Sequence, residues 1–252
     1  MIEIKNVGED IKVNIEGEGE ELLRELTHLG VAIYNAASNA LGYTIDEGYY
    51  NDETEDGEGE NKESEEYEAY EVSRGDHFFY NSIEFICLES KPDALFAITA
   101  NCIGEHSFDE NNRNDWRSST LNSWLNGEFL SENFDKKDLI SREIDLTADN
   151  GDKAYGATSS YLAPLTAFEY RKYRDIVPLF NEGMWTVTPW YCGTPIASRA
   201  YNVRYVASSG VLYYSIADLA SGLAPACIFD LTILSSRRSA RTGEIELYEE
   251  ER

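Results

Sequence analysis

The chain has 252 residues, of which 42% are hydrophobic and 12% aromatic, and its formal net charge is −26. This composition is typical of a globular protein with one or two domains. Nucleic acid is excluded as a direct partner, because affinity for phosphates depends on Lys and Arg side chains. No stretch approaches the roughly 18 consecutive apolar residues of a membrane helix, so we expect no membrane insertion.

The first residues, Met-Ile-Glu-Ile-Lys, lack the basic and then apolar pattern of a secretory signal. We therefore expect a cytoplasmic protein, or one that associates with a virion assembled there. The cysteines are far apart in the sequence and form no Cys-x-x-Cys pair, which argues against a zinc site and against a disulfide scaffold. Four free and buried thiols are the expectation: Cys87, Cys102, Cys192 and Cys227.

Residues 1–45 are predicted to form a β-hairpin followed by an amphipathic helix. Nearly alternating apolar residues predict strands over 2–7 and 11–15, joined at Gly8-Glu9-Asp10. Apolar residues then recur at spacings of three and four from Leu22 to Ala40, which is helical periodicity. So small a unit cannot bury both faces, and its apolar stripe needs a partner. The alternatives are packing within the chain and self-association through the helix.

Residues 46–72 are predicted to be an acidic linker. From Asp46 to Glu71 there are 13 acidic side chains and one basic one, Lys62, a net charge of −12. Such a run is typical of a solvated segment that repels itself.

A calcium loop is the alternative for this tract, because several residues fall at EF-hand positions 1, 3, 5, 6 and 12. These residues are Asp52, Thr54, Asp56, Gly57 and Glu63. Gly59 stands where such a loop normally places an aliphatic residue, and no amphipathic helix flanks the tract. The pattern therefore favours the linker.

Residues 73–236 are predicted to form a second domain with helices early and strands late. Residues 78–80 and 83–88 predict a strand pair around Asn81-Ser82, and residues 94–100 predict a buried strand. One helix follows Ser119 as its N-cap, and a second begins at a capping box of Thr166 and Glu169. Later strands are expected over 185–188, 201–207, 211–215 and 227–234, with a hairpin turn at 208–210. The order of elements predicts an α+β domain.

Residues 237–252 carry a small basic cluster, Arg237, Arg238 and Arg241, followed by acidic residues. We expect them to form a charged and frayed tail.

One stretch of the second domain carries a family resemblance. Residues 116–126 read Trp-Arg-Ser-Ser-Thr-Leu-Asn-Ser-Trp-Leu-Asn. They resemble the W-x-x-S-x-L-R-x-W-L-N signature of a widespread bacterial and phage domain family of unknown function. Further matches follow in the family's order at 161–165, 169–170, 185–189, 200–210 and 222–226, so the resemblance covers about residues 75–235.

This family is similar to C-type-lectin-like domains of the kind found in formylglycine-generating enzymes and in the variable proteins of diversity-generating retroelements. The resemblance therefore implies a C-type-lectin-like fold, preceded here by the small hairpin-plus-helix unit. Asn122 stands where the signature has an arginine, and Ala224 stands where the family has an arginine before proline. The loss of these arginines weakens the transfer of any arginine-based function from the family. The motif's large apolar residues are predicted to be core: Trp116, Leu121, Trp124 and Leu125.

Few reactive groups converge in the sequence. The histidines, His28, His77 and His106, lack metal-ligand spacing to one another. No phosphate loop, dinucleotide-binding glycine motif or nucleophile elbow is present. Cys102 and His106 are four residues apart and suggest a thiolate pair as an alternative, but the sequence offers no third group to orient them. We predict no enzymatic activity and no cofactor.

A metal-dependent lectin site is also disfavoured. Sugar binding through calcium would call for a Glu-Pro-Asn or Gln-Pro-Asp triplet, and the nearest match, Lys91-Pro92-Asp93, begins with a cation. The loop of residues 109–115 is rich in oxygen ligands, but a solvated turn explains it equally well. The sequence therefore predicts no metal site.

A binding surface remains, between Trp185 and Tyr214. Tyr and Arg interleaved with small residues are typical of adaptable binding surfaces, and the resemblance places the ligand face on these C-terminal strands and loops. The alternative is that half of the tyrosines alternate into the core. The predicted ligand-binding residues are Trp190, Tyr191, Arg199, Tyr201, Arg204, Tyr205, Tyr213 and Tyr214.

These observations predict a non-catalytic ligand- or surface-binding protein that is phage-related and recognises a protein or a cell-surface ligand. In one version, the tract from Trp185 to Pro225 is diversified by a retroelement. Two alternatives belong to other classes. One is a structural or decoration protein of a virion, and the other is an acidic decoy of a DNA-binding protein, which the charge alone suggests.

Overall fold

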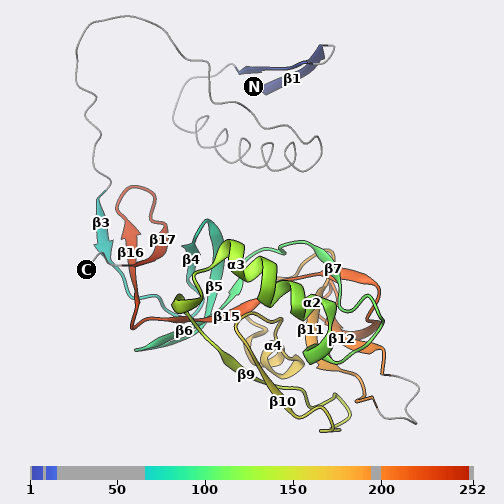
Figure 1. Ribbon diagram of the computed structural model, residues 1–252. Helices are drawn as coiled ribbons and strands as arrows, with labels where there is room; N and C mark the ends of the chain where they lie inside the picture. The colour runs from blue at the N-terminus through green and yellow to red at the C-terminus, as the bar shows by residue number, and fades with distance from the viewer. Residues whose placement is uncertain (1, 8–9, 16–65, 194–199, 250–252) are drawn as a thin grey trace, which may run out of the picture. The chain divides into compact units, whose positions relative to one another are not determined.

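The computed structural model describes residues 2–7, 10–15, 66–193 and 200–249, and the chain divides into two units between Asn61 and Lys62 (Figure 1). In the first unit, β1 (Ile2–Val7) pairs antiparallel with β2 (Asp10–Ile15), so that Ile2 lies opposite Ile15. The predicted hairpin is confirmed. The predicted helix and the EF-hand-like match lie outside the described residues, as does the acidic tract up to residue 65.

The second unit is β-rich, and its largest sheet has eight strands in the order β3-β16-β17-β4-β5-β6-β15-β8. All neighbours in this sheet pair antiparallel except β17 and β4, which are parallel. Its strands are β3 (Tyr67–Ala69), β4 (His77–Tyr80), β5 (Ile83–Lys91), β6 (Ala94–Thr99), β8 (Leu139–Ile140), β15 (Ala226–Asp230), β16 (Leu234–Ser239) and β17 (Ile245–Glu249).

The β4–β5 turn follows from local chemistry. Asn81 and Ser82 have φ values of 47° and 66°, the left-handed conformation that a two-residue hairpin requires and that Asn tolerates well. The hairpin places Phe78 opposite Phe85, and their rings stack at 5.7 Å between centroids. Phe229 of β15 packs edge-on against Phe85 at 5.1 Å. All three side chains are fully buried, so this turn sets the register of one end of the core.

Smaller sheets complete the unit. One has three strands, β11 (Met184–Pro189), β12 (Asn202–Val206) and β13 (Leu212–Ile216), in that order. The turn from β12 to β13 is closed by Gly210, whose φ is 77°, as the sequence predicted. Two-stranded pairs are formed by β9 (Arg142–Asp145) with β10 (Ala157–Ser160), and by β7 (Glu105–Ser107) with β14 (Ala220–Gly222).

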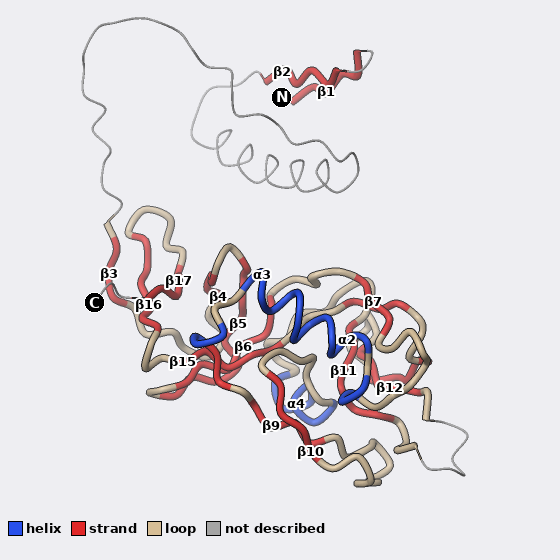
Figure 2. Tube along the Cα trace, viewed as in Figure 1, coloured by secondary structure: helices blue, strands red, loops and turns tan. Residues whose placement is uncertain are grey.

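The helices are short and begin where the sequence predicted (Figure 2). The Ser119 side chain caps α2 (Thr120–Trp124) by accepting from the Asn122 amide, and a π-helical turn (Leu125–Phe129) continues into α3 (Leu130–Asn133). Thr166 and Glu169 form the predicted capping box of α4 (Ala167–Tyr173). Single turns of 3-10 helix span Trp116–Ser118 and Lys136–Asp138.

The signature residues of the 116–126 motif are structural. Trp116, Leu121 and Leu125 are buried, and Trp124 is half-buried against the core, as predicted. Asn126 also has a defined role. Its side-chain oxygen accepts from the amides of Tyr161 and Leu162, and its Nδ2 donates to the Leu162 carbonyl at 2.8 Å. The motif therefore ties the α2–α3 segment to the strand region that follows β10.

Two predicted boundaries are wrong. The expected tail from residue 237 contains the second half of β16 and all of β17, which are paired from Leu234 opposite Glu249 to Arg238 opposite Ile245. Ile245 and Leu247 are buried in the main core, which holds this segment in the sheet. The expected linker also ends too late, because β3 pairs with β16 (Figure 1). Arg237 lies over the Tyr67 ring at 3.9 Å, so the basic cluster anchors the end of the acidic tract.

The cysteines are free, as predicted: Cys87, Cys192 and Cys227 are buried, whereas Cys102 is partly exposed. Among the described residues, no helix is long and apolar enough to span a membrane.

Candidate functional site

An aromatic cluster forms between the residues that follow β11 and a tyrosine of β13. The Trp190 ring lies 4.7 Å from the Tyr214 ring and 5.8 Å from the Tyr191 ring, between centroids. Backbone hydrogen bonds fix the position of the loop: the Trp190 amide donates to the Asn202 carbonyl, and Asn114 Nδ2 donates to the Tyr191 carbonyl at 2.8 Å. These three predicted residues therefore form one surface. We call Trp190, Tyr191 and Tyr214 the aromatic cluster.

Arg204 supports this cluster from β12. Its guanidinium lies 4.2 Å from the centre of the Trp190 ring, and its Nη2 donates to Asp149 Oδ2 at 2.5 Å. The Arg204 side chain is only 13% exposed. Because so little of its side chain is exposed, Arg204 supports the cluster from beneath Trp190, and the ligand contact predicted for it stays a prediction.

The other predicted residues lie on one face of the β11-β12-β13 sheet or the other, according to strand alternation. Tyr213 and Tyr214 are each 53% exposed and project from opposite faces of β13. Tyr205 pairs with Tyr213 across the ladder, packs against Trp185 at 6.2 Å and is half-buried. Tyr201 is exposed, and Arg199 lies outside the described residues. The expectation that some tyrosines alternate toward the core is therefore confirmed for Tyr205.

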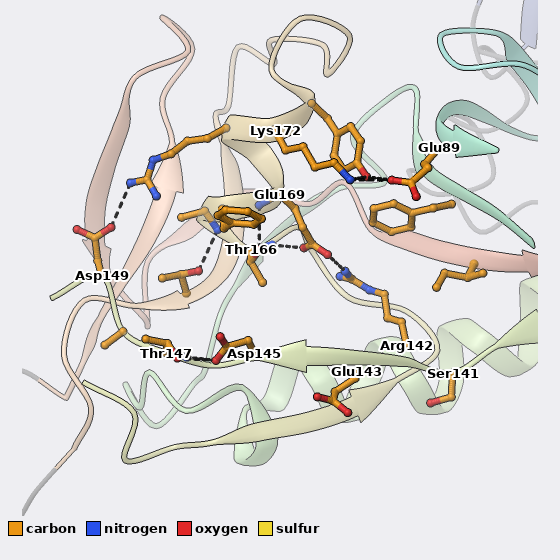
Figure 3. Close-up of a pocket in the computed structure, with 18 of the residues that line it drawn as sticks. Glu89, Ser141, Arg142, Glu143, Asp145, Thr147, Asp149, Thr166, Glu169 and Lys172 are labelled. Atoms are coloured by element: carbon orange, nitrogen blue, oxygen red, sulfur yellow. Dashed lines mark hydrogen bonds and ion pairs between the residues drawn. The ribbon is translucent and has the colours of Figure 1, made fainter. Parts of the chain in front are cut away.

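A cleft of about 810 Å³ lies beside α4 (Figure 3). Its walls are formed by α4, by β9 with the residues after it, and by the end of β5. Phe168, which belongs to this lining, is 73% exposed, the most of any large apolar side chain in the described residues. The cleft therefore combines an exposed aromatic ring with polar and charged walls.

Ion pairs hold the walls of the cleft in place. Arg142 of β9 and Glu169 of α4 point toward each other, with Nη1 and Oε1 2.6 Å apart (Figure 3). Arg142 also donates to the carbonyls of Ala163 and Pro164, so the buried guanidinium joins β9 to the start of α4. Glu169 completes the α4 capping box as well, which fixes the carboxylate from both sides.

A second pair closes the β5 end of the cleft. Lys172 Nζ lies 2.7 Å from Glu89 Oε2, and the Tyr173 hydroxyl donates to the same oxygen at 2.6 Å. The hydrogen bonds from Lys172 and then Tyr173 lower the pKa of Glu89 to about 2. Glu89 is therefore charged at neutral pH and holds α4 against β5.

Asp149 belongs both to the cleft and to the support of the aromatic cluster. It lines the cleft, accepts from Arg171 of α4 at 3.2 Å and accepts from Arg204 of β12. Burial disfavours its charged form, but the hydrogen bonds from Arg204 and Arg171 outweigh burial and lower the pKa of the carboxyl. Asp149 therefore links a wall of the cleft to the support of the aromatic cluster, and we call the cleft and the cluster together the recognition face.

The geometry does not support a thiolate pair of Cys102 and His106. Cys102 Sγ lies 4.0 Å from the Gly183 carbonyl, whereas the His106 ring stacks on Trp124 at 4.3 Å, so the two side chains have different partners. Burial raises the pKa of the Cys102 thiol to about 11, which keeps it protonated at neutral pH.

The 109–115 loop is structural. Asp109 is fully buried, and its carboxylate accepts from the Arg113 side chain and from the Arg113 and Thr120 amides. These donors take up the oxygens that a cation would need. Within the described residues, no group of three or more His, Cys, Asp or Glu side chains is placed to hold a metal ion. The loop contributes instead through Asn114, which supports Tyr191.

Sequence reasoning missed most of the cleft. Glu169 was identified only as a capping residue, and Arg142, Asp149 and Glu89 were not singled out. The capping box was the one local signal, since it marked where α4 begins. Comparisons of the chain with models of protein families, with curated proteins and with solved structures find no match.

Proposed function

We propose that this chain is a non-catalytic binding protein whose second unit recognises a protein or cell-surface ligand through the C-terminal strands and loops. In this proposal the second unit has a C-type-lectin-like fold, and the protein is phage-related and made in the cytoplasm. The first unit is a docking or oligomerisation element. The fold assignment rests on the resemblance of the 116–126 motif and on the β-rich architecture of the second unit.

The observation that carries the proposal is the exposed aromatic surface beside the cleft. Tyr213 and Tyr214 expose more than half of their side chains, although exposed rings contribute little to folding. On the face that carries Tyr214, Arg204 and Asp149 hold Trp190 in one place, so this face is ordered before any ligand arrives. Preorganised Tyr and Trp side chains lose little conformational entropy on binding.

The experiment is capture on the immobilised full chain, with EDTA present to remove free divalent cations. Whole bacterial cells and purified cell-envelope polysaccharides and proteins are passed over it. The proposal predicts retention of at least one of them, without added calcium. If nothing is retained and the chain co-purifies with phage particles instead, the structural alternative replaces it.

The retroelement version makes a separate prediction about the gene. The tract from Trp185 to Pro225 contains β12, β13, β14 and all of β11 except Met184, and the exposed side chains of β13 can vary while the ladder hydrogen bonds stay. The flanking DNA should then encode a reverse transcriptase and carry a near-copy of this tract that differs mainly at adenines. If neither is present, the proposal reduces to a binding face of fixed sequence.

A further inference from the structure

β13 is an unprotected sheet edge. It is the last strand of the β11-β12-β13 sheet, and its residues, Leu-Tyr-Tyr-Ser-Ile, carry no charge. Natural edge strands are usually blunted by charges, proline, short length or a covering segment. The ends of the eight-stranded sheet follow this rule, because β3 carries Glu68 and β8 has only two residues. β13 departs from it.

The register shows which backbone groups of β13 face outward. The Ala207 amide donates to the Val211 carbonyl, and the Ala217 amide donates to the Tyr201 carbonyl. In the β12–β13 ladder, the residues that bond to each other through the backbone are therefore the odd-numbered ones. The backbone groups of the even-numbered residues of β12 face β11 instead, since the Arg204 carbonyl accepts from the Thr186 hydroxyl of β11. The amides of Leu212, Tyr214 and Ile216 therefore face away from β12.

Among these residues, Tyr214 is the one whose N–H and C=O are both open, because the carbonyls of the other two have partners. The Leu212 carbonyl accepts from Arg204 at 3.4 Å, and the Ile216 carbonyl accepts from Leu219. The N–H and the C=O of Tyr214 have no such partner within the described part of the chain. Both a donor and an acceptor are thus available at the centre of the strand.

Aromatic side chains flank this edge on both faces of the sheet. Tyr213 lies beside Tyr205 on one face, and Tyr214 lies beside Trp190 on the other. A strand added to β13 would alternate its side chains between these two faces. Apolar or β-branched side chains would then contact a ring on either side.

We propose that β13 binds an extended peptide segment of a partner protein, which adds to the sheet as a further strand and carries basic residues at its ends. This proposal rests on the proposed function and specifies its ligand as a polypeptide held through main-chain hydrogen bonds. The described residues of the second unit carry 27 acidic and 15 basic side chains, which favours a basic partner and opposes edge-to-edge pairing with a second copy of the chain.

The probe is the acetylated and amidated peptide Lys-Val-Thr-Val-Thr-Val-Lys, titrated into the full chain at low salt. Binding is measured by calorimetry, and the amide signals of Leu212, Tyr214 and Ile216 are followed by NMR. We expect those three amides to shift together on binding. The same peptide with N-methyl groups on alternate residues has the same side chains but lacks the ladder donors, and it should not bind.

The decisive variants are Tyr214→Pro and Tyr214→Ala. Both remove the ring, but only proline removes the outward N–H, and an edge strand tolerates proline at such a position. The peptide should bind Tyr214→Pro about tenfold more weakly than Tyr214→Ala, by the usual strength of a hydrogen bond. Thermal unfolding of both variants checks that the fold is intact. The N-methylated peptide tests the main-chain hydrogen bonds on the unaltered protein.

Three results would overturn this inference: no binding of the probe, equal binding to the proline and alanine variants, or a concentration-dependent dimer that Tyr214→Pro dissociates. The variant Trp190→Ala distinguishes failure of the β13 edge proposal from failure of the proposed function. Binding that Trp190→Ala abolishes and Tyr214→Pro leaves intact would keep the recognition face and reject the edge. Binding that only Tyr214→Pro weakens would keep the edge and reject the aromatic cluster.

Discussion

Arg204 and Asp149 lie 55 residues apart in sequence, and their side chains form a hydrogen bond of 2.5 Å beneath the aromatic cluster. The two side chains are 13% and 19% exposed, so solvent screens this pair less than a surface ion pair. Asp149 also accepts from Arg171 of α4. One carboxylate therefore links the cleft to the ring of Trp190.

Replacing Arg204 should destabilise the protein. Arg204→Ala removes the support of Trp190 and leaves the Asp149 carboxylate with only the longer hydrogen bond from Arg171. We expect a loss of about 2 kcal/mol in the free energy of unfolding, the usual effect of breaking a charged hydrogen bond of low exposure. Urea unfolding measures it. Arg241→Ala, an exposed arginine between β16 and β17, is the control, and a loss as small as that of the control would contradict the positioning role.

Asn126 of the signature motif should matter more than its neighbour Asn122. Asn126→Ala leaves the backbone groups of Tyr161 and Leu162 without their partner, which should cost about 2 kcal/mol. Asn122 is equally half-buried, its side chain bonds only to Asn126 within the described part of the chain, and alanine is the better helix former. Asn122→Ala should therefore change stability by less than about 1 kcal/mol. Equal losses in urea unfolding would show that the motif does not join the two segments.

The Glu89 ion pair should give stability a specific pH dependence. The pKa of Glu89 is depressed to about 2 from an ordinary value of 4.5, so its contribution is complete above that ordinary value. It is lost as the pH falls toward 2. Glu89→Gln should destabilise the protein at pH 7, and the difference from the wild type should shrink below pH 4.5. A difference that stays constant down to pH 2.5 would refute the pairing, and Glu143→Gln in the same cleft is the control.

The first unit should mediate self-association if its predicted helical stripe has no partner within the chain. The comparison is the solution mass, by light scattering, of the full chain and of a chain that starts at Lys62. That start keeps β3, which belongs to the second unit. We expect the full chain to form an oligomer and the shorter chain to be a monomer. Two monomers would reject self-association.

Local patterns in the sequence predicted the strands with clear alternation and the turns with special residues. The β4–β5 hairpin and the turn at Gly210 were predicted because Asn, Ser and Gly favour the conformations found there. Trp190 and Tyr214 could be grouped because they lie in neighbouring segments with a binding-type composition. The starting points of α2 and α4 were predicted from the capping side chains of Ser119 and Thr166.

The remaining features depend on partners distant in sequence. β16 reads Leu-Ser-Ser-Arg-Arg-Ser, which carries no strand signal of its own, and it is ordered by β17 and β3. Arg142 and Glu169 meet across 27 residues, and neither position has a local pattern that identifies its partner. The walls of the cleft were therefore beyond single-sequence reasoning, because tertiary pairing creates them.

The most direct test of the recognition face compares three forms of the full chain for binding to the bacterial cells, polysaccharide or protein that the immobilised chain retains. These are the wild type, the double variant Tyr213→Ala with Tyr214→Ala, and Glu132→Ala at an exposed position of α3, outside the recognition face. All three should have the same melting temperature within a few degrees, since the substituted side chains are exposed. The recognition face predicts at least tenfold weaker binding for the tyrosine variant alone. Undiminished binding by that variant would contradict the assignment of ligand recognition to β13 and the aromatic cluster.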